Sequence, residues 1–421
     1  MPQSFEDVLA LLEQAHSATF AGGGDGIDFL LNQLSKDESD LFRLAAIPHF
    51  FNYEILQVVK PQLTRERAKE LCSHFEDFSV VTRSDQGLAL HDKTREYLFG
   101  KWLEPEGNSK ELFILANQRL SHFFKNLDGT DTQSWLSKQE HHAHYMFHLL
   151  GESQQKGFEQ FERLIGKLRH QYAFNQCTTL IQLVHEYDHV LLERQLLRLA
   201  YQEGKLAVDL RDWNQAQDLL SIIHDNNEAP VELQVKSLMQ HGIALAGLKE
   251  FNPARKLLNE ALELIDQYSE LRPLRHQVLL ELAIVMRDCS NEHSDQVKTL
   301  LETSIIFARE HGDLPCVATA LNTIATLHLK HRHIAEAIKD LQESLTVLKQ
   351  SGDRFQQSAV YNNLGLAEME KREWESASDY FNQALEIEKI AGHIRGQAFC
   401  LANLTRAYFN MEYTKDAVET G

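Results

Sequence analysis

The chain has 421 residues, of which 43% are hydrophobic, and its formal net charge at pH 7 is −19. This length allows two or three domains, and a solenoid of repeats can also reach it. The negative charge argues against a chain that binds nucleic acid, because phosphates are neutralised by basic side chains.

Neither a transmembrane run nor a secretory leader is found in the sequence. The five cysteines are dispersed and include no CxxC pair. This spacing is typical of buried thiols in a reducing compartment. We therefore expect a cytoplasmic protein with no membrane partner.

The N-terminal residues 1–26 are expected to form a short amphipathic helix over 4–17 and then a glycine-rich turn. A phosphate-binding loop of the Walker type needs Lys and Ser or Thr after its last glycine. Ile27 and Asp28 stand there instead, and the carboxylate of Asp28 would repel phosphate. The glycines therefore predict a turn and no nucleotide site.

Residues 27–104 combine helices with one alternating segment. Two helices hinged at Pro48 and a third helix over 63–74 are expected. The stretch 79–90 alternates in hydrophobicity around a turn at Ser84-Asp85-Gln86-Gly87, which indicates a β-hairpin. Another helix follows at once. Helices with one such hairpin predict a small winged-helix domain.

Two strings in this region, LFRLAAIPHFF and FSVVTRSDQGLALHDKTREYL, resemble the winged-helix module of STAND-type signalling ATPases. Leu90-His91-Asp92 is similar to the Met-His-Asp motif of that family, which implies a nucleotide-sensing role for His91. The Walker lysine is absent, so such a role needs a nucleotide-binding ATPase domain in cis or in trans. The alternative, which we favour, is that His91 and Asp92 simply begin a helix, with Asp92 at its positive end.

A winged helix that reads DNA needs basic side chains along one helix face. The helix expected over 63–74 carries Arg65, Arg67 and Lys69, but glutamates interrupt them. Residues 1–104 hold 10 Lys and Arg against 17 Asp and Glu, a balance of −7. A transcription regulator with a ligand-sensing array is therefore the second choice, and nucleic acid is not expected as a partner.

A helical connector without a clear repeat is expected over 105–196. His144 and His148 stand at i and i+4 on one helix, and His141 could add a third ligand, which is a spacing that can hold zinc. The HExxH arrangement that would supply a general base is missing. A metal-dependent hydrolase around these histidines is a third possibility. The string YMFHLLGES also resembles the linking helix of STAND relatives, which implies a structural histidine.

The strongest pattern lies in residues 318–392, where two copies of one motif stand 40 residues apart. Small residues recur where two helices must approach closely, and larger apolar residues recur between them. The equivalent pairs are Ala325 and Gly365, Ala337 and Ala377, Leu341 and Phe381, and Ser344 and Ala384. Self-similarity of this period indicates a solenoid of helical hairpins.

These copies resemble the tetratricopeptide repeat (TPR), whose pattern of small and aromatic residues is matched by Leu364-Gly365, Trp374, Ala377, Phe381 and Ala384. The resemblance implies a right-handed superhelix. Gly352 and Gly392 are expected to be left-handed helix caps, and Asp353 is expected to cap the next helix. The same phase predicts units near 197–234, 235–277, 278–317, 318–357, 358–397 and, incomplete, 398–421.

In TPR proteins the first helices line a concave groove that holds peptides. The groove positions predicted here are Asn322, Thr326, Lys330, Asn362, Asn363, Leu366, Asn403, Arg406 and Phe409. Asparagine offers both a donor and an acceptor, as an extended peptide requires. Equally, these asparagines could bond only the neighbouring repeat, and the sequence leaves both roles open.

The sequence as a whole predicts a mainly α protein, with a winged-helix domain before a TPR array over 197–421. No nucleophile elbow, phosphate loop or convincing carboxylate pair is found, so we expect a protein that is not an enzyme and needs no cofactor. The expected function is to bind a partner protein or peptide, as the sensor arm of a STAND-like system. Because the array ends within a hairpin, we expect the protein to continue or a neighbour to cover this end.

Overall fold

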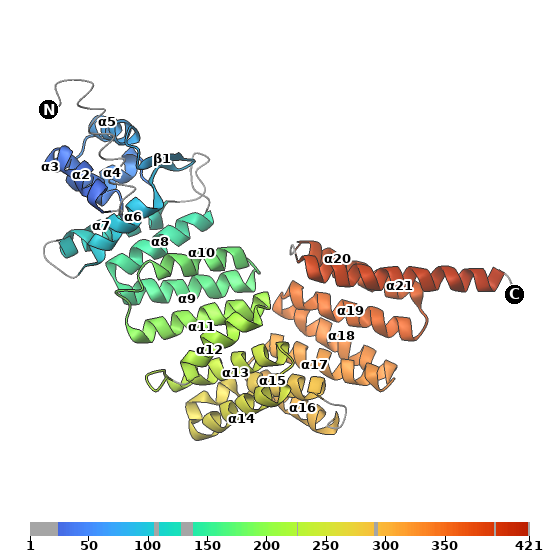
Figure 1. Cartoon of the computed structure of the whole chain (residues 1–421). Helices are drawn as coiled ribbons and strands as arrows, with labels where there is room; N and C mark the ends of the chain where they lie inside the picture. Colours follow the sequence, from blue (N-terminus) through green and yellow to red (C-terminus); the bar gives the residue numbers. More distant parts are fainter. Residues whose placement is uncertain are drawn as a thin grey trace. The chain divides into compact units, whose positions relative to one another are not determined.

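The computed structural model describes residues 24–104, 109–127, 138–224, 226–289, 294–390 and 393–419 (Figure 1). The helix expected over 4–17 and the cap expected at Gly392 lie outside these ranges. The chain divides into two compact units, with the boundary between Leu196 and Leu197, in the first turn of α11 (Glu193–Leu210). The described residues form twenty α-helices, one 3-10 helix and one two-stranded sheet. None of these helices is long and apolar enough to cross a membrane.

The first unit begins with helices packed around a β-hairpin, in the winged-helix arrangement expected from the sequence. Its elements are α2 (Asp25–Gln33), α3 (Lys36–Leu44), α4 (Tyr53–Val59), α5 (Arg65–Glu76), β1 (Val81–Ser84), β2 (Gly87–Leu90) and α6 (Asp92–Leu103). The helix expected over 63–74 and the helix expected after the hairpin are confirmed as α5 and α6.

The two strands pair in antiparallel register, from Val81 with Leu90 to Ser84 with Gly87, which confirms the expected turn. Gly87 has a φ of 141°, and a Cβ there would lie 2.6 Å from the carbonyl oxygen of Phe51. Phe51 needs this close approach because its N–H and C=O both bond Leu88. Only glycine combines this backbone angle with that contact.

The expectation of two helices hinged at Pro48 is wrong, because the segment forms three helices. The additional break lies at Ser35, whose hydroxyl accepts from the backbone N–H of Glu38. The Glu38 carboxylate in turn accepts from the backbone N–H of Ser35. This reciprocal pair is a capping box, and it starts α3 two residues after α2 has ended.

Four helices complete the first unit: α7 (Ser109–Asn126), α8 (Lys138–Glu152), α9 (Gln154–His170) and α10 (Phe174–His185). Aromatic rings fill the core between α6 and these helices. The Phe99 ring on α6 lies 5.7 Å from that of Phe147 and 5.5 Å from that of Tyr187, centroid to centroid. Such contacts bury large apolar areas and favour tilted or edge-on rings.

A largely buried ion pair fixes α6 to the end of α10. The Arg95 guanidinium donates to the Glu186 carboxylate at 2.7 Å, and the two side chains are 12% and 27% exposed. Arg95 also donates to the backbone carbonyls of Ile47 and Pro48. The imidazole of His49 lies 2.7 Å from the other Glu186 oxygen. The winged-helix part and the helices after it therefore share one polar network.

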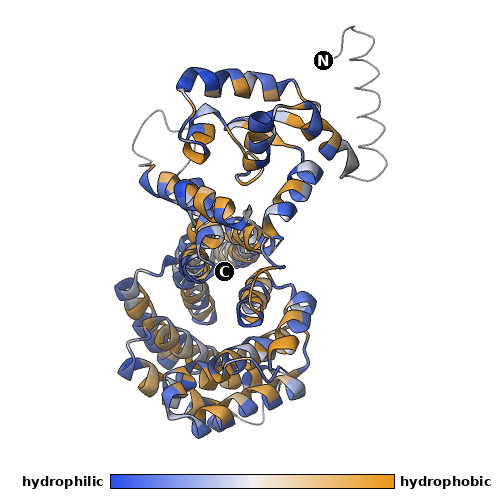
Figure 2. Cartoon of the chain, turned by 90° about the vertical axis from the view of Figure 1, so that its left-hand side faces the viewer, coloured by the Kyte–Doolittle hydropathy of each residue, from blue (hydrophilic) through white to orange (hydrophobic). Residues whose placement is uncertain are grey.

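The second unit is a stack of helical hairpins. Its helices are α11 (Glu193–Leu210), α12 (Trp213–His224), α13 (Val231–Gly247), α14 (Phe251–Gln267), η1 (Ser269–Leu274), α15 (Arg275–Cys289), α16 (Ser294–Glu310), α17 (Leu314–Lys330), α18 (Ile334–Ser351), α19 (Arg354–Glu370), α20 (Trp374–Ile390) and α21 (Ile394–Glu419). Figure 2 shows hydrophobic and hydrophilic residues alternating around the helices, as amphipathic packing requires.

Small residues of the first helices receive large side chains of the second helices. A Cβ placed on the glycine would lie 2.8 Å from the partner side chain for Gly204 with Leu220, 3.0 Å for Gly242 with Leu258 and 2.6 Å for Gly365 with Phe381. Ala325 and Leu341 are both fully buried in the hairpin between the last two pairs. The repeated columns of small and large residues are thus the packing contacts of each hairpin.

Residues with positive φ mark two kinds of turn in the stack. Within a hairpin the turn residue has positive φ without being glycine, at Arg211 (61°), Lys249 (67°), Arg332 (60°) and Arg372 (64°). Between hairpins glycine takes this role, at Gly312 (71°) and Gly352 (75°), so the cap expected at Gly352 is confirmed. Asp353 caps α19 by accepting from the backbone N–H of Gln356, which confirms its expected role.

The within-hairpin turn also occurs in the first unit. Tyr172, between α9 and α10, has a φ of 56°, and the N–H of Ala173 bonds the Leu168 carbonyl at 3.0 Å. The N–H of His333 bonds the His328 carbonyl in the same way at 2.8 Å. The connector therefore contains a hairpin turn of the kind found in the array, although its sequence shows no clear repeat.

Candidate functional site

The first helices of successive hairpins line the inner side of the second unit. Each of α13, α15 and α17 contacts the next first helix, and these contacts are more extensive than those between successive second helices. Because successive first helices contact one another more extensively than successive second helices, the stack curves toward the side on which the first helices lie. The first helices therefore form the concave face, where the sequence placed its candidate groove.

The asparagines of this face form two hydrogen-bonded pairs between neighbouring first helices. The Asn363 amide on α19 donates to the Asn322 carbonyl oxygen on α17 at 2.8 Å. The Asn403 amide on α21 donates to the Asn362 carbonyl oxygen on α19, also at 2.8 Å. Bonding of the neighbouring repeat, one of the two roles left open by the sequence, is thus present.

The two pairs differ in exposure. Asn362 and Asn403 are 7% and 8% exposed, whereas Asn322 and Asn363 are both partly exposed. An asparagine side chain has two N–H donors and an oxygen that accepts two bonds. The bond between Asn322 and Asn363 leaves the Asn322 NH2 group and the Asn363 oxygen with hydrogen-bonding capacity. These are the donor and the acceptor that a peptide main chain needs.

Other predicted groove residues contact neighbouring first helices or stand exposed. The Thr326 hydroxyl lies 3.5 Å from the Arg287 guanidinium on α15. The Arg406 guanidinium lies 3.6 Å from the Met369 sulfur on α19. Leu366 is partly buried, and the exposed positions are Lys330, Arg406 and Phe409. The structure thus brings the asparagines together in pairs across α17, α19 and α21.

The three histidines considered for zinc lie in the core of the first unit. The rings of His144 and His148 stack on Phe124, with centroids 5.1 and 5.4 Å away. The Nδ1 atom of His148 lies 2.8 Å from the Asn117 side-chain oxygen, and His141 is also buried. Burial lowers the pKa of His144 to about 3 and that of His148 well below its usual range. Both rings are therefore neutral core aromatics at pH 7.

A different set of potential metal ligands converges in the second unit. Within the described ranges, His276, Asp313 and Cys316 form the group whose ligand atoms all lie within 4.8 Å of one another. Hydrogen bonds from His276 and Gln277 hold the pKa of the Asp313 carboxyl down at about 2, and burial raises the pKa of the Cys316 thiol to about 12. Sequence reasoning missed this set because its members are far apart in the chain.

His91 is an exposed residue directly before α6. Its side chain makes no capping bond, whereas its backbone N–H bonds the Val80 carbonyl at 2.9 Å. Asp92 lies in the first turn of α6, where the helix dipole favours a negative charge. This is the geometry of a helix start, and the nucleotide-sensing role of His91 stays a proposal.

The basic side chains of α5 are engaged by other groups of the winged-helix part. Arg65 donates to the Tyr53 hydroxyl, and the Lys69 ammonium lies 5.2 Å from the centre of the same ring. Arg67 pairs with the carboxylates of Glu38 and Glu70. A DNA-reading helix needs such cations for phosphates and base edges, so this arrangement weakens the transcription-regulator alternative.

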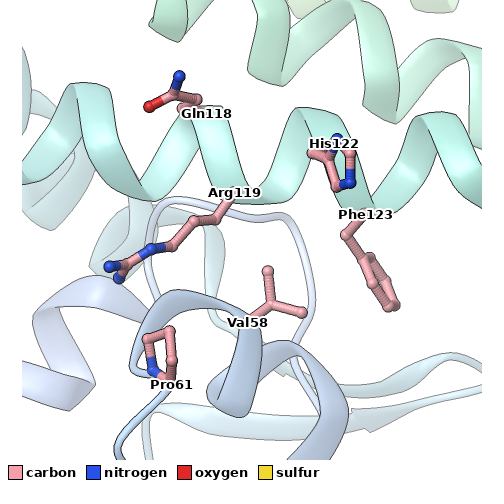
Figure 3. Close-up of a pocket in the computed structure, with 6 residues that line it drawn as sticks. All are labelled: Val58, Pro61, Gln118, Arg119, His122 and Phe123. Carbon is pink, nitrogen blue, oxygen red and sulfur yellow. The ribbon is translucent and has the colours of Figure 1, made fainter.

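A pocket of about 500 Å³ lies between α7 and the end of α4 (Figure 3). Its lining consists of Val58, Pro61, Gln118, Arg119, His122 and Phe123. The Arg119 guanidinium donates to the Val59 backbone carbonyl at 2.9 Å, and this bond fixes the positively charged group beside the end of α4. The lining contains no carboxylate, hydroxyl or thiol, and among these six residues His122 is the side chain that acid-base catalysis could use.

Comparisons with known proteins identify the fold. No protein-family model and no curated protein match the chain. A STAND protein with a tetratricopeptide repeat sensor from Pyrococcus horikoshii superposes with a TM-score of 0.50 at 13% identity, over 91% of this chain and 55% of its own length. This chain therefore spans about half the length of that protein.

Two Rap structures are less similar. A Rap protein complexed with competence and sporulation factor gives a TM-score of 0.46 at 10% identity, over 89% of this chain and 99% of its own. The apo form of RapI gives 0.45 at 16% identity, over 63% of this chain and 73% of its own. Both scores are below 0.5, so the TPR-type fold rests on the hairpins themselves and on the STAND protein.

Proposed function

We propose that the second unit binds an extended segment of a partner protein or peptide along its concave face. The observation that carries this proposal is the Asn322–Asn363 pair, which lies partly exposed across two neighbouring first helices. Its mutual bond fixes both amides before a ligand arrives. A donor and an acceptor that are already ordered lose less side-chain entropy on binding than two free amides would.

The surroundings of the pair supply the other parts of a peptide site. Leu366, one turn after Asn362 on α19, offers a partly buried apolar contact, and the Thr326 hydroxyl lies one turn after Asn322 on α17. Main-chain hydrogen bonds provide affinity in such grooves, and apolar pockets select the side chains. We therefore propose the nine groove residues as the site, with Asn322 and Asn363 at its centre.

We further propose that the chain is the recognition arm of a STAND-like regulator. The fold likeness to a STAND protein with a TPR sensor supports this, as does the winged-helix part before the helices. A nucleotide-binding ATPase domain, in cis or in trans, is then the second partner, and His91 is the residue proposed to report on its nucleotide.

The proposed role involves no catalysis. Support comes from two of the five thiols, which are strong nucleophiles only when ionised. Burial raises the pKa of Cys316 to about 12 and that of Cys400 to about 11, which disfavours the nucleophilic thiolate at these two positions.

The test compares capture of partner proteins by the full chain and by two variants. Asn322→Ala with Asn363→Ala removes the exposed pair. Asn382→Ala, at an exposed position of the second helix α20, is the matched control. Quantitative mass spectrometry of the captured proteins should show a partner held equally by the wild type and the control, and at least about tenfold less by the double variant, which is the loss expected from about 1.4 kcal/mol. Equal capture by all three proteins would refute the site.

A further inference from the structure

A buried polar cluster joins two neighbouring hairpins outside the proposed groove residues. His276 lies in the first turn of α15, Asp313 caps α17, and Cys316 lies in the first turn of α17. The His276 Nε2 atom is 2.9 Å from an Asp313 oxygen, and the Cys316 sulfur is 3.6 Å from the Ser304 hydroxyl. One nitrogen, one oxygen and one sulfur ligand thus meet at a single junction.

The repeat itself brings the cluster together. His276 and Cys316 occupy equivalent positions of consecutive first helices, 40 residues apart. The Cys316 backbone N–H bonds Asp313 at 3.1 Å, so the cap that starts α17 also holds the carboxylate beside the thiol. At the next junction Asp353 again caps its helix, but Gln356 stands in place of the cysteine. The ligand set therefore belongs to one junction and is not a general feature of the array.

Two further observations describe the polar groups at this junction. The His276 side chain is only 3% exposed, and its Nδ1 atom has no hydrogen-bond partner within the described part of the chain. The Nε2 atom of the same ring is the one that faces Asp313 and would bind an ion there. Glu281, on the same helix as His276, makes no hydrogen bond or ion pair with a described residue. Its negative charge helps to raise the pKa of the Cys316 thiol.

We propose that this cluster binds one zinc ion through His276, Asp313 and Cys316. Zinc prefers a mixture of imidazole, carboxylate and thiolate ligands, whereas magnesium and calcium prefer oxygen alone. Zinc ligands in a tetrahedral site lie roughly 3.3–3.7 Å apart, so the widest separation allowed in this cluster, 4.8 Å, would have to close by about 1 Å, whereas the His276–Asp313 pair at 2.9 Å would have to open slightly. A fourth position is left for water.

Binding replaces contacts that the metal-free protein makes. The ion takes the place of the His276–Asp313 hydrogen bond, and the Cys316 thiol loses its proton to solvent as the zinc–sulfur bond forms. The ion would then join α15 to α17 and stiffen the array where its third and fourth hairpins meet. In the absence of zinc, the hydrogen bond and the helix cap hold the same junction.

Cobalt(II) provides a direct test, because a cobalt–thiolate bond gives a charge-transfer absorption that nitrogen and oxygen ligands do not give. The full chain, stripped of metal with a chelator, should develop this band with one equivalent of Co²⁺ and lose it when Zn²⁺ is added. Cys316→Ser should abolish the band. Cys400→Ser, a buried cysteine outside the cluster, should keep it. The proposal fails if the wild type gives no band, or if the band survives in Cys316→Ser.

Two conservative variants separate metal binding from folding. His276→Gln can still donate to Asp313, and Asp313→Asn can still cap α17, so both should keep the wild-type circular dichroism. Both should weaken Zn²⁺ binding, measured by competition with a chromogenic chelator, by more than the roughly 10–100-fold that loss of an outer-shell partner costs. Unchanged zinc affinity in folded protein would overturn the assignment. These outcomes do not depend on whether the concave face binds a peptide.

Discussion

The buried histidines of the first unit predict that it loses stability in mild acid. His144 packs against Phe124, and its Nδ1 atom has no hydrogen-bond partner within the described residues. The titratable or charged groups that act on it are His49, Arg95, His141 and Glu186. Burial is the largest cause of its low pKa of about 3, and three of these four neighbours lower the pKa further.

The sign and size of the effect follow from proton linkage. Between pH 6.5 and 3 the unfolded chain binds a proton at His144 that the folded chain does not bind, so the free energy of unfolding falls as the pH falls. Lowering the pH from 7 to 5 should therefore cost about 2 kcal/mol at this residue, since one pKa unit corresponds to about 1.4 kcal/mol. The pKa of His148 is also lowered, so its contribution has the same sign.

The assay is urea unfolding at pH 7 and pH 5, followed by hydrogen exchange of peptides from α8. His144→Phe keeps a ring in contact with Phe124 and removes the titrating group. The difference between the two pH values should shrink by about 2 kcal/mol in this variant. His189→Gln, at an exposed position of the same unit, should keep the wild-type difference. The reasoning is refuted if His144→Phe leaves the pH dependence unchanged.

Three further predictions concern packing and the polar pairs, all measured as free energies of unfolding in urea. Gly365→Ala should destabilise by roughly 1–2 kcal/mol because its Cβ would meet Phe381, whereas Gly166→Ala, whose Cβ meets nothing within 4 Å, should stabilise by up to about 1 kcal/mol. Arg95→Met should cost roughly 2–4 kcal/mol, since it leaves a carboxylate that is only 27% exposed without its guanidinium. Replacing both Asn362 and Asn403 by Leu should be nearly neutral, within about 1 kcal/mol, because both partners of a buried bond are removed together. A loss above 3 kcal/mol would show that this pair holds the array together.

Much of the array could be predicted because its packing is periodic. Gly365 and Phe381 are 16 residues apart, on either side of the turn between α19 and α20, and the same separation of 16 residues recurs for Gly204 with Leu220 and for Gly242 with Leu258. Local signals also sufficed for Gly352 and Asp353, whose residue types report their backbone roles directly. Such features depend on neighbours in the chain or on exact repetition, and a sequence shows both.

The errors have local physical causes. The break at Ser35 was readable, since Ser and Glu three residues apart are the residues of a capping box, but the continuous apolar pattern around them favoured one helix. The turn at Tyr172 had no such signal, because a tyrosine seldom adopts a positive φ and does so here under tertiary packing. Predicting that His276 and Cys316 meet would have required aligning the copy before residue 318 with the copy after it. The earlier copy matches the repeat pattern only loosely, so this alignment was not evident from the sequence.

The candidate site was predictable in its position but not in its bonds. Asn322 and Asn362 are equivalent in the repeat, yet neither bonds the other. Asn322 instead accepts from Asn363, and Asn362 accepts from Asn403. In both pairs the donor stands one residue after the position that the repeat makes equivalent to the acceptor. Alignment of repeats gives the row of asparagines, and only the geometry of the helices gives the partners.

The two asparagine pairs raise the question of why polar side chains line the face formed by the first helices. A hydrogen bond between two buried amides contributes only about 1 kcal/mol of net stability, and an apolar pair of similar size serves as well. Stability alone therefore gives little reason for a second pair at partly exposed positions, where water already satisfies both amides. A row that orders donors and acceptors across α17 and α19 has a clear use when an extended main chain lies along it, since such a ligand needs both groups at fixed positions. This argument supports the proposal that the partly exposed pair serves recognition, whereas the buried pair is explained by repeat packing.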